Sequence, residues 1–409
     1  MGLHIYSQSK LKPVDVDLLE LAKCPACFGQ SACPAFFRGG VRLPTLYGYR
    51  PIHASDFEKF DGLTDVDLGM LEREPAVLRQ LYFPSTSSEV DVEVCRRQRS
   101  DDFQDEAPLP RCIPRLSIWR WMATDGPGTS DPVDVNIVRN MSVFTRCASP
   151  RLLQLIQSRY RERSSNLHLP AQKLWLRFDE LTLLFNLAIN PHMVIATTFP
   201  PNEGWPFPLQ IGACGRMTLE KGTTKPLSLF VNAPVKTRLQ ILKSLLQIPS
   251  KLISNATLVD PKNGDFVLYL GDYRWNVFGV DPFTYHVSII QARHIIAVDL
   301  RKNKEVKSPF VIETNATYIQ DVCQDHAFAT DQPCLSEEHV SGLCRSNPPS
   351  DHNYWAVCMT AMFGDRLLVR DMSRDLLFSL EQCLKDSQDG ARRSHIEAAL
   401  EVISMELTY

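Results

Sequence analysis

Residues 266–291 read FVLYLGDYRWNVFGVDPFTYHVSIIQ. The stretch begins with a short apolar run, continues through a polar turn and ends on a second apolar run at residues 287–290. Apolar runs of this length that are bounded by turn residues predict short strands. The chain is therefore expected to carry strands deep in its second half.

Helical patterns lie on both sides of this stretch. Amphipathic periodicity predicts helices at residues 235–248, 371–384 and 394–407. The last of these has Ser394 and Glu397 at the spacing of a capping box. The chain beyond residue 220 is therefore expected to be mainly helical.

The first half of the chain has a different pattern. Residues 34–150 are rich in Pro, Asp, Ser and Arg, which predicts short strands and long loops. Two helices are expected between residues 150 and 189, and the run MVIATTF at residues 193–199 is typical of a strand. Residues 212–215 fit a hairpin turn. Strands first and helices later, with one boundary near residue 220, predict a two-lobed α+β protein.

Composition excludes several classes of protein. The chain has 409 residues, 44% of them apolar, and a formal net charge of −3. This is the composition of a soluble globular protein, and a dedicated nucleic-acid binder would carry a basic excess instead. No run approaches the ~18 apolar residues that a membrane-spanning helix needs. Only 19 glycines occur, which disfavours a protein built on glycine-rich phosphate loops.

Cysteines and glycosylation patterns indicate the compartment. The number of cysteines is even, and Asn140, Asn255 and Asn315 each begin an N-glycosylation pattern. Such cysteines form disulfides in the secretory pathway, whereas in the cytosol they would be thiols or metal ligands. We favour disulfides. The twelve candidates are Cys24, Cys27, Cys33, Cys95, Cys112, Cys147, Cys214, Cys323, Cys334, Cys344, Cys358 and Cys383.

Cys24 and Cys27 form a CxxC pair, which in a structural zinc site needs a second close pair of ligands. No such pair follows, and no βαβ pattern surrounds the motif, so neither zinc nor a thioredoxin-like redox role is favoured. Residues 1–12 show no apolar core of a signal peptide, and we expect the upstream coding sequence to supply one.

Five short motifs, spread over the chain, resemble one family. In order they are KCPACFG at residues 23–29, EGWPF at 203–207, GACGRM at 212–217, LYLGD at 268–272 and DHNYWAVC at 351–358. Together they resemble the "deleted in autism" proteins, the second branch of the divergent protein kinase domain family. All twelve cysteines have counterparts in that family.

The resemblance implies a protein-kinase-like bilobal fold of the α+β class in a secreted or Golgi-lumenal glycoprotein. It implies a cysteine-rich N-terminal segment at residues 1–45, a kinase-like N-lobe at 46–220 and a mainly helical kinase-like C-lobe at 221–409. No transmembrane segment is expected.

The resemblance also implies roles for single residues. Asp272 takes the position of the catalytic base, Arg79 that of the strand lysine which contacts the nucleotide phosphates, and Glu180 is the candidate for the acid of the regulatory helix. Val277 and Gln291 stand where a kinase has its magnesium-binding Asn and Asp. Magnesium prefers carboxylates and phosphate oxygens, which neither residue offers.

The expected glycine-rich phosphate loop is missing as well, because the only upstream glycine cluster is Arg38-Gly39-Gly40. We therefore predict a pseudokinase that binds a protein partner or a cell-surface receptor in signalling, with no cofactor and no nucleic acid.

Two alternatives stay open at the level of sequence. One is an active divergent kinase that uses ATP with Mg²⁺ or Mn²⁺ in a rearranged site, with Asn276, Asp281 or Asp299 as substitute ligands. The other is a secreted growth-factor-like ligand for which the kinase-like fold is only a scaffold. For the disulfides, Cys95–Cys112 is the one pairing that we predict, because it closes a short charged loop.

Overall fold

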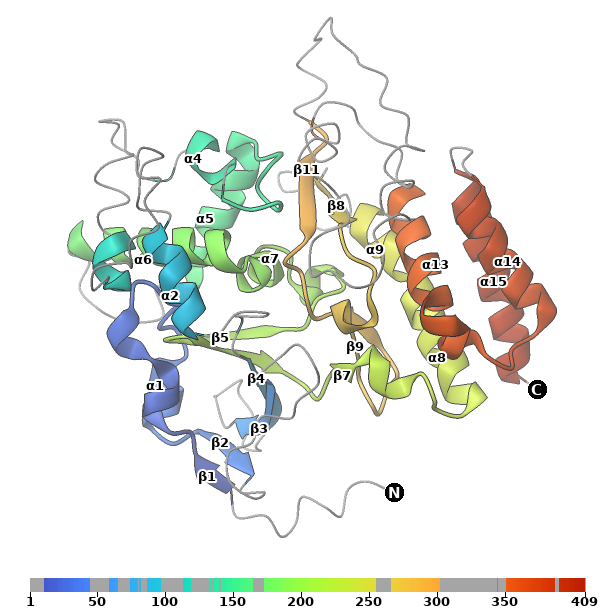
Figure 1. Ribbon diagram of the computed structural model, residues 1–409, viewed down its shortest axis with the longest axis horizontal. Helices are drawn as coiled ribbons and strands as arrows, with labels where there is room; N and C mark the ends of the chain where they lie inside the picture. Colours follow the sequence, from blue (N-terminus) through green and yellow to red (C-terminus); the bar gives the residue numbers. More distant parts are fainter. Residues whose placement is uncertain are drawn as a thin grey trace, which may run out of the picture. The chain divides into compact units, whose positions relative to one another are not determined.

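The computed structural model describes residues 11–44, 59–64, 74–79, 81, 87–96, 113–118, 133, 135–139, 141–164, 173–254, 266–301, 344, 351–386 and 390–408. The chain, shown in Figure 1, divides into two compact units. The first unit comprises residues 1–142, 156–198 and 209–223, and the second comprises residues 143–155, 199–208 and 224–409.

The first unit contains a six-stranded antiparallel sheet with the strand order β1-β2-β3-β4-β6-β5. The strands are β1 (Leu11–Pro13), β2 (Val41–Pro44), β3 (Lys59–Thr64), β4 (Glu74–Arg79), β5 (Gln210–Cys214) and β6 (Met217–Lys221). β5 and β6 form a hairpin as predicted, but residues 212–214 of the expected turn belong to β5, and the chain turns at Gly215, which has a φ of 60°. A Cβ atom there would lie 1.7 Å from the Leu19 carbonyl oxygen, so only glycine fits this turn.

The first unit also contains helices. Those of the first unit are α1 (Cys33–Phe37), α2 (Ser87–Arg96), α4 (Val135–Arg139), α6 (Lys173–Ile189) and α7 (His192–Thr198), and α5 (Pro150–Ser164) contributes to both units. Helices α5 and α6 confirm the two that the periodicity predicts. Residues 34–150 hold helices as well as the short strands that their composition predicts.

The predicted strand at residues 193–199 is wrong, because residues 193–198 belong to the fully buried helix α7 and Phe199 follows it. A continuous apolar run lacks the periodicity that distinguishes a strand from a buried helix. The Asn190 side chain caps the start of this helix, because its Oδ1 accepts from the His192 N–H at 3.1 Å. The Ile195 N–H donates to the Pro191 carbonyl at 2.8 Å.

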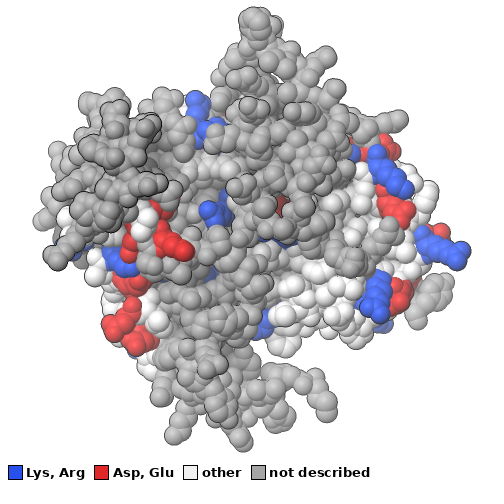
Figure 2. Space-filling view, in the orientation of Figure 1, with Lys and Arg blue, Asp and Glu red and all other residues white. Residues whose placement is uncertain are grey.

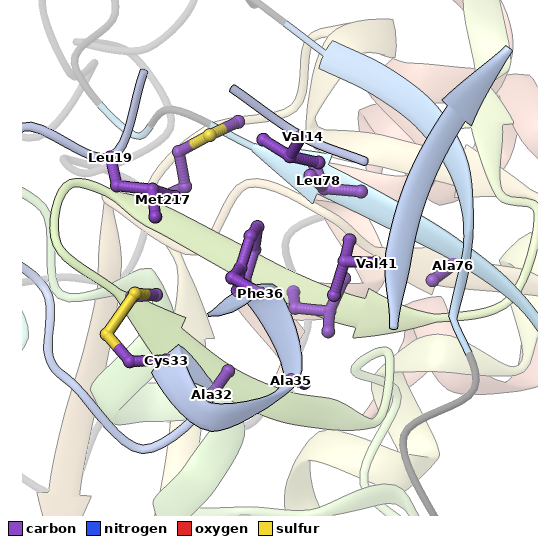
Figure 3. Close-up of a cluster of buried hydrophobic side chains, with 12 residues drawn as sticks. Val14, Leu19, Ala32, Cys33, Ala35, Phe36, Val41, Ala76, Leu78 and Met217 are labelled. Carbon is purple, nitrogen blue, oxygen red and sulfur yellow. A yellow bond between two sulfur atoms is a disulfide. The ribbon is translucent and has the colours of Figure 1, made fainter. Parts of the chain in front are cut away.

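A hydrophobic cluster joins α1 to the sheet (Figure 3). Phe36 and Cys33 of α1 pack in it with Val41, Leu78 and Met217 from three strands. A disulfide between Cys33 and Cys214 links the helix covalently to β5. Gly39 terminates α1. Its N–H donates to the Phe36 carbonyl at 3.0 Å, and it has a φ of 69°.

The second unit contains two small antiparallel sheets. One has the order β10-β9-β7, with β7 (Lys225–Pro226), β9 (Phe278–Val280) and β10 (Val287–Ile289), and the other pairs β8 (Phe266–Leu270) with β11 (Ile295–Asp299). Both strands that the stretch 266–291 predicts are confirmed as β8 and β10. Short 3₁₀ turns occur at Val16–Leu19, Leu21–Lys23, Pro201–Glu203, Leu227–Phe230, Trp275–Val277 and Leu367–Val369.

The helices of the second unit are α8 (Val235–Leu246), α9 (Ile248–Ser254), α13 (Asp351–Arg366), α14 (Arg374–Lys385) and α15 (Ala391–Thr408). α14 and α15 lie side by side (Figure 1). The predicted capping box is wrong, because α15 begins at Ala391 and contains Ser394. Tertiary contacts set its start instead, since the Gly390 N–H donates to the Asp351 Oδ2 at 3.0 Å.

All nine cysteines that the structure describes are in disulfides, as predicted. Four bridges lie wholly within the described residues: Cys24–Cys27, Cys33–Cys214, Cys147–Cys344 and Cys358–Cys383. Cys95 is also disulfide-bonded, but Cys112, Cys323 and Cys334 lie outside the described residues, so the Cys95–Cys112 pairing stays a prediction. Asn140, Asn255 and Asn315 lie outside them as well.

In the described part of the chain, no single helix combines the length and apolar character of a membrane span; residues 178–189 and 192–198 reach them only as a pair bent by 111°.

Candidate functional site

Arg79 lies at the end of β4, an inner strand of the large sheet, and its side chain is 0% exposed. Its Nε donates to the Glu220 Oε2 at 2.8 Å. Glu220 comes from the neighbouring strand β6 and is equally buried. The arginine at the expected lysine position is therefore part of an ion pair that is closed to water.

The Glu220 carboxylate also binds two residues from outside β4. The His192 Nε2 lies 2.9 Å from the Glu220 Oε1, and the Gln210 Nε2 donates to the same oxygen at 2.9 Å. Burial by itself raises the pKa of Glu220, but Arg79, His192 and Gln210 outweigh it and lower the pKa to about 2. The carboxylate is thus ionised at every physiological pH.

Glu180, the candidate acid of the regulatory helix, lies in α6 with a partly buried side chain. The carboxylate that accepts the hydrogen bond from the Arg79 Nε belongs to Glu220, a residue for which the sequence predicted no role. One signal was available: a charged residue inside the otherwise buried strand β6 must find a buried partner of opposite charge.

The second unit carries Asp272, which the resemblance assigns to the position of the catalytic base. Asp272 follows β8 directly and is 9% exposed. Arg274, two residues on, donates to its Oδ1 from the backbone N–H and from Nε, both at 3.0 Å, and to its Oδ2 from Nη2 at 2.6 Å. Both oxygens of the carboxylate are therefore engaged by one neighbouring cation.

Side chains of helix α13 bind backbone groups on both sides of Asp272. The Asn353 amide accepts from the Leu270 N–H at 2.9 Å and donates to the Leu268 carbonyl at 2.8 Å. The Thr360 hydroxyl donates to the Tyr273 carbonyl at 2.7 Å. These bonds satisfy backbone groups that β11 does not pair, and they fix the loop on both sides of Asp272.

Val277 and Gln291, which the resemblance assigns to the magnesium-ligand positions of a kinase, are brought together by backbone hydrogen bonds. The Val277 carbonyl accepts from the Ile290 N–H at 2.8 Å and from the Gln291 N–H at 3.2 Å. The adjoining pair Phe278–Ile289 of β9 and β10 has the same register.

The side chains at these two positions differ in their surroundings. Val277 is 2% exposed and belongs to the core. The Gln291 Nε2 is buried and makes no hydrogen bond within the described residues.

His294 is a further member of this site that the sequence did not indicate. Its carbonyl accepts from the Gly271 N–H at 3.0 Å, and a Cβ atom on residue 271 would lie 2.3 Å from that oxygen, so the approach requires glycine. Burial lowers the pKa of His294 to about 4, with Arg293 and Arg274 adding to the effect and Asp272 opposing it. The imidazole is therefore neutral at pH 7.

Asn276, Asp281 and Asp299 are the substitute ligands considered for a rearranged metal site. The two aspartates accept hydrogen bonds from protein groups. The Asp281 Oδ1 accepts from the Phe283 and Thr284 N–H groups at 2.9 and 2.8 Å. Asp299 binds Arg151, whose Nε donates to its Oδ2 at 3.1 Å. Asn276 is partly buried next to Val277.

The pKa of Asp299 is lowered, because hydrogen bonds from Arg151 and Ser149 outweigh the effect of burial. Among the residues that the structure describes, no three His, Cys, Asp or Glu side chains are grouped so as to hold a metal ion.

The chain matches known proteins along most of its length. Residues 184–388, about half of the chain, match the family model described as the protein-kinase domain of FAM69. Divergent protein kinase domain 2A of Xenopus tropicalis is 28% identical over 359 residues, which cover 85% of this chain and 75% of that protein. The protein of the same name from Homo sapiens is 28% identical over 353 residues, with the same coverage.

Divergent protein kinase domain 2B of Bos taurus is 28% identical over 250 residues, or 58% of this chain and 52% of that protein. These matches confirm the resemblance seen in the five motifs and the expected kinase-like fold of mixed helix and sheet with several disulfides. The chain belongs to the family described as the protein-kinase domain of FAM69.

Proposed function

We propose that this chain is a pseudokinase: a kinase-like protein that acts by binding a protein partner and does not transfer phosphate. The proposal rests chiefly on the pairing of Val277 with Gln291. Backbone hydrogen bonds join these two residues, and the resemblance assigns them to the positions where a kinase needs two magnesium ligands.

Neither residue fits a magnesium–nucleotide site. Magnesium is bound through carboxylates and phosphate oxygens in octahedral geometry. Val277 has no oxygen in its side chain, and that side chain is buried in the core. Gln291 carries no charge, and Arg293 places a cation two residues away. The two positions that would balance the charge of a magnesium ion are thus uncharged, and a basic residue lies close to one of them in the sequence.

The remaining kinase positions support the same proposal. The Asp272 carboxylate would have to accept a substrate proton, and Arg274 already donates to both of its oxygens. The Arg79 Nε is turned to Glu220 inside the sheet, whereas a strand lysine would reach nucleotide phosphates.

We further propose that the protein works in the lumen of the secretory pathway, such as the Golgi, or outside the cell, as a glycoprotein. Disulfides persist in oxidising compartments, and every described cysteine is in one. The three glycosylation candidates belong to the same proposal.

A protein or a cell-surface receptor is the partner that the charge distribution favours. The formal net charge is −3, and acidic and basic side chains are interspersed on the described part of the face in Figure 2. Nucleic-acid binding relies on a basic patch or stripe instead.

A thermal-shift assay with ATP tests the catalytic part of the proposal. The unaltered protein is expected to show no stabilisation by ATP that depends on Mg²⁺ or Mn²⁺. Metal-dependent stabilisation, together with phosphate incorporation that Asp272→Ala abolishes, would overturn the proposal and favour the active kinase with a rearranged site.

Cell binding tests the partner and the compartment. Protein exported behind an added signal peptide should carry its disulfides by non-reducing mass mapping and bind saturably to a cell surface. Asp272→Asn should leave this binding unchanged. Export with mostly free thiols, or binding lost in Asp272→Asn, would contradict the proposal.

A further inference from the structure

The segment from Cys24 to Cys33 lies against helix α6 within the first unit. The Asn186 Nδ2 of α6 donates to the Thr182 carbonyl of its own helix at 2.7 Å, and it also lies within hydrogen-bond distance of the Phe28 and Cys27 carbonyls, at 3.1 and 3.4 Å. Asn186 is 0% exposed, so these bonds are made in the dry interior, where their loss would leave polar groups unsatisfied.

Side-chain packing adds to this contact. The Phe28 ring meets the Phe185 ring of α6 edge to face, with 5.5 Å between the centroids. Ala26 and Phe28 belong to one hydrophobic cluster with Leu181 and Phe185. The segment therefore covers the apolar face of the last turns of α6.

The opposite side of the segment is paired with the β5–β6 hairpin. The Phe28 N–H donates to the Gly215 carbonyl, the Gly215 N–H to the Gly29 carbonyl and the Ala32 N–H to the Ala213 carbonyl, each at 2.8 Å. The buried Arg216 Nε donates to the Ala26 carbonyl at 2.9 Å. The segment thus behaves as an extra layer between the helix and the hairpin.

Covalent bonds keep this layer in place. Cys33, at its end, is joined to Cys214 of β5, and Cys24 is joined to Cys27 within it. The Tyr160 hydroxyl of α5 donates to the Phe28 carbonyl at 3.4 Å, so a second helix holds the same peptide group.

We propose that residues 24–33 form a built-in clamp that fixes α6 against the sheet. In regulated kinases the helix at this place moves, and phosphorylation or a partner sets its position. Here the clamp sets that position permanently, so α6 takes one place without a ligand or a modification. This inference concerns the position of α6 and does not depend on whether the chain transfers phosphate.

Hydrogen–deuterium exchange of the full chain, read by mass spectrometry, tests the clamp. Asn186→Ala should raise the exchange of residues 24–33 and of α6 together, on the order of tenfold, because local opening follows the loss of buried hydrogen bonds. The peptides of α14 and α15 should keep their protection.

Two further variants make the result specific. Tyr160→Phe removes a bond to the clamp without altering α6, and it should give a smaller change in the same peptides; it also serves if Asn186→Ala does not fold. Asn353→Ala is the matched control, because Asn353 is a buried asparagine that binds backbone groups of β8, and it should leave α6 unchanged.

The clamp is refuted if residues 24–33 exchange faster in Asn186→Ala and Tyr160→Phe while α6 keeps its full protection. It is equally refuted if either variant accelerates exchange uniformly in both units, since that is global unfolding.

Discussion

The ion pair between Arg79 and Glu220 places two charges in the interior of a sheet, where neither reaches water. Such a pair tolerates no loss of one partner, because the other then stays buried without compensation. His192 and Gln210 complete the set of donors to Glu220, so this part of the site is a closed structural network.

Glu220→Gln tests this network at the level of one residue. The substitution keeps the shape of the side chain and removes its charge, and it should lower the free energy of unfolding by about 3–5 kcal/mol. Urea denaturation at pH 7 measures the change. Glu397→Gln, which alters an exposed ion pair with Arg393 on α15, is the control and should move the midpoint little. Equal effects of both substitutions would contradict the assignment.

The same carboxylate makes stability depend on acid pH. Its pKa falls from 4.5 to about 2 on folding, so its stabilising contribution is complete above pH 4.5 and is lost as the pH falls towards 2. Glu220→Gln, which cannot titrate, should show a shallower loss of stability over that range in denaturation curves recorded at several pH values.

His294 predicts a pH effect in a higher range. Its pKa is lowered from 6.5 to about 4, so the unfolded chain binds a proton more readily and stability falls as the pH drops from 6.5 to 4. Between pH 7 and 5 the loss should be about 2 kcal/mol.

His294→Gln should reduce the loss by about that amount in urea denaturation at the two pH values, while His286 and His352, whose pKa values burial also lowers, keep their own contributions. A His294→Gln protein with an unchanged difference would show that another group is responsible.

At the scale of elements, α13 decides how the loop after β8 is held. Its residues Asn353 and Thr360 bind backbone groups on either side of Asp272, and the Trp275 Nε1 donates to the Thr360 carbonyl at 3.0 Å. Within the motif DHNYWAVC, Asn353 therefore supports the backbone before Asp272, and His352 lies 2.7 Å from the Leu270 carbonyl through its Nε2.

Thr360→Val and Thr360→Ser form a matched pair for this support. Valine keeps the volume but leaves the Tyr273 carbonyl without its hydroxyl donor, which should cost about 1–2 kcal/mol. Serine keeps the hydroxyl and should cost clearly less. Chemical denaturation measures both. A larger loss in the serine variant would mean that the methyl group, and not the hydrogen bond, holds the loop.

At the scale of the whole molecule, the disulfides close loops of very different length. Cys33–Cys214 spans 181 residues and Cys358–Cys383 spans 25. In the chain-entropy model a bridge stabilises by restricting the unfolded chain, and more so for a longer loop.

Replacing both cysteines of Cys33–Cys214 by serine should therefore cost about 1–2 kcal/mol more than the same change at Cys358–Cys383. Thermal unfolding without reductant, checked by denaturant titration, compares the two double variants. The opposite order would indicate that strain or packing at the bridges outweighs chain entropy.

The sequence by itself determined the elements that have one face in water and one in the core. Helices α5, α8, α14 and α15 have that periodicity, and the apolar runs around Asp272 also gave the buried strands β8 and β10. That Val277 and Gln291 offer no carboxylate to a metal ion could also be predicted, because residue type alone decides it.

Only the tertiary structure decided the features that depend on a buried partner. Helix α7 has no exposed face and hence no period to detect, and the start of α15 is set by Asp351, 39 residues earlier. Glu220 meets Arg79 across 141 residues of sequence because β4 and β6 are neighbouring strands, in which Arg79 lies two residues beyond Val77, the register partner of Glu220. A partner of this kind is chosen by packing and desolvation, and neither is encoded in the residues adjacent to it along the chain.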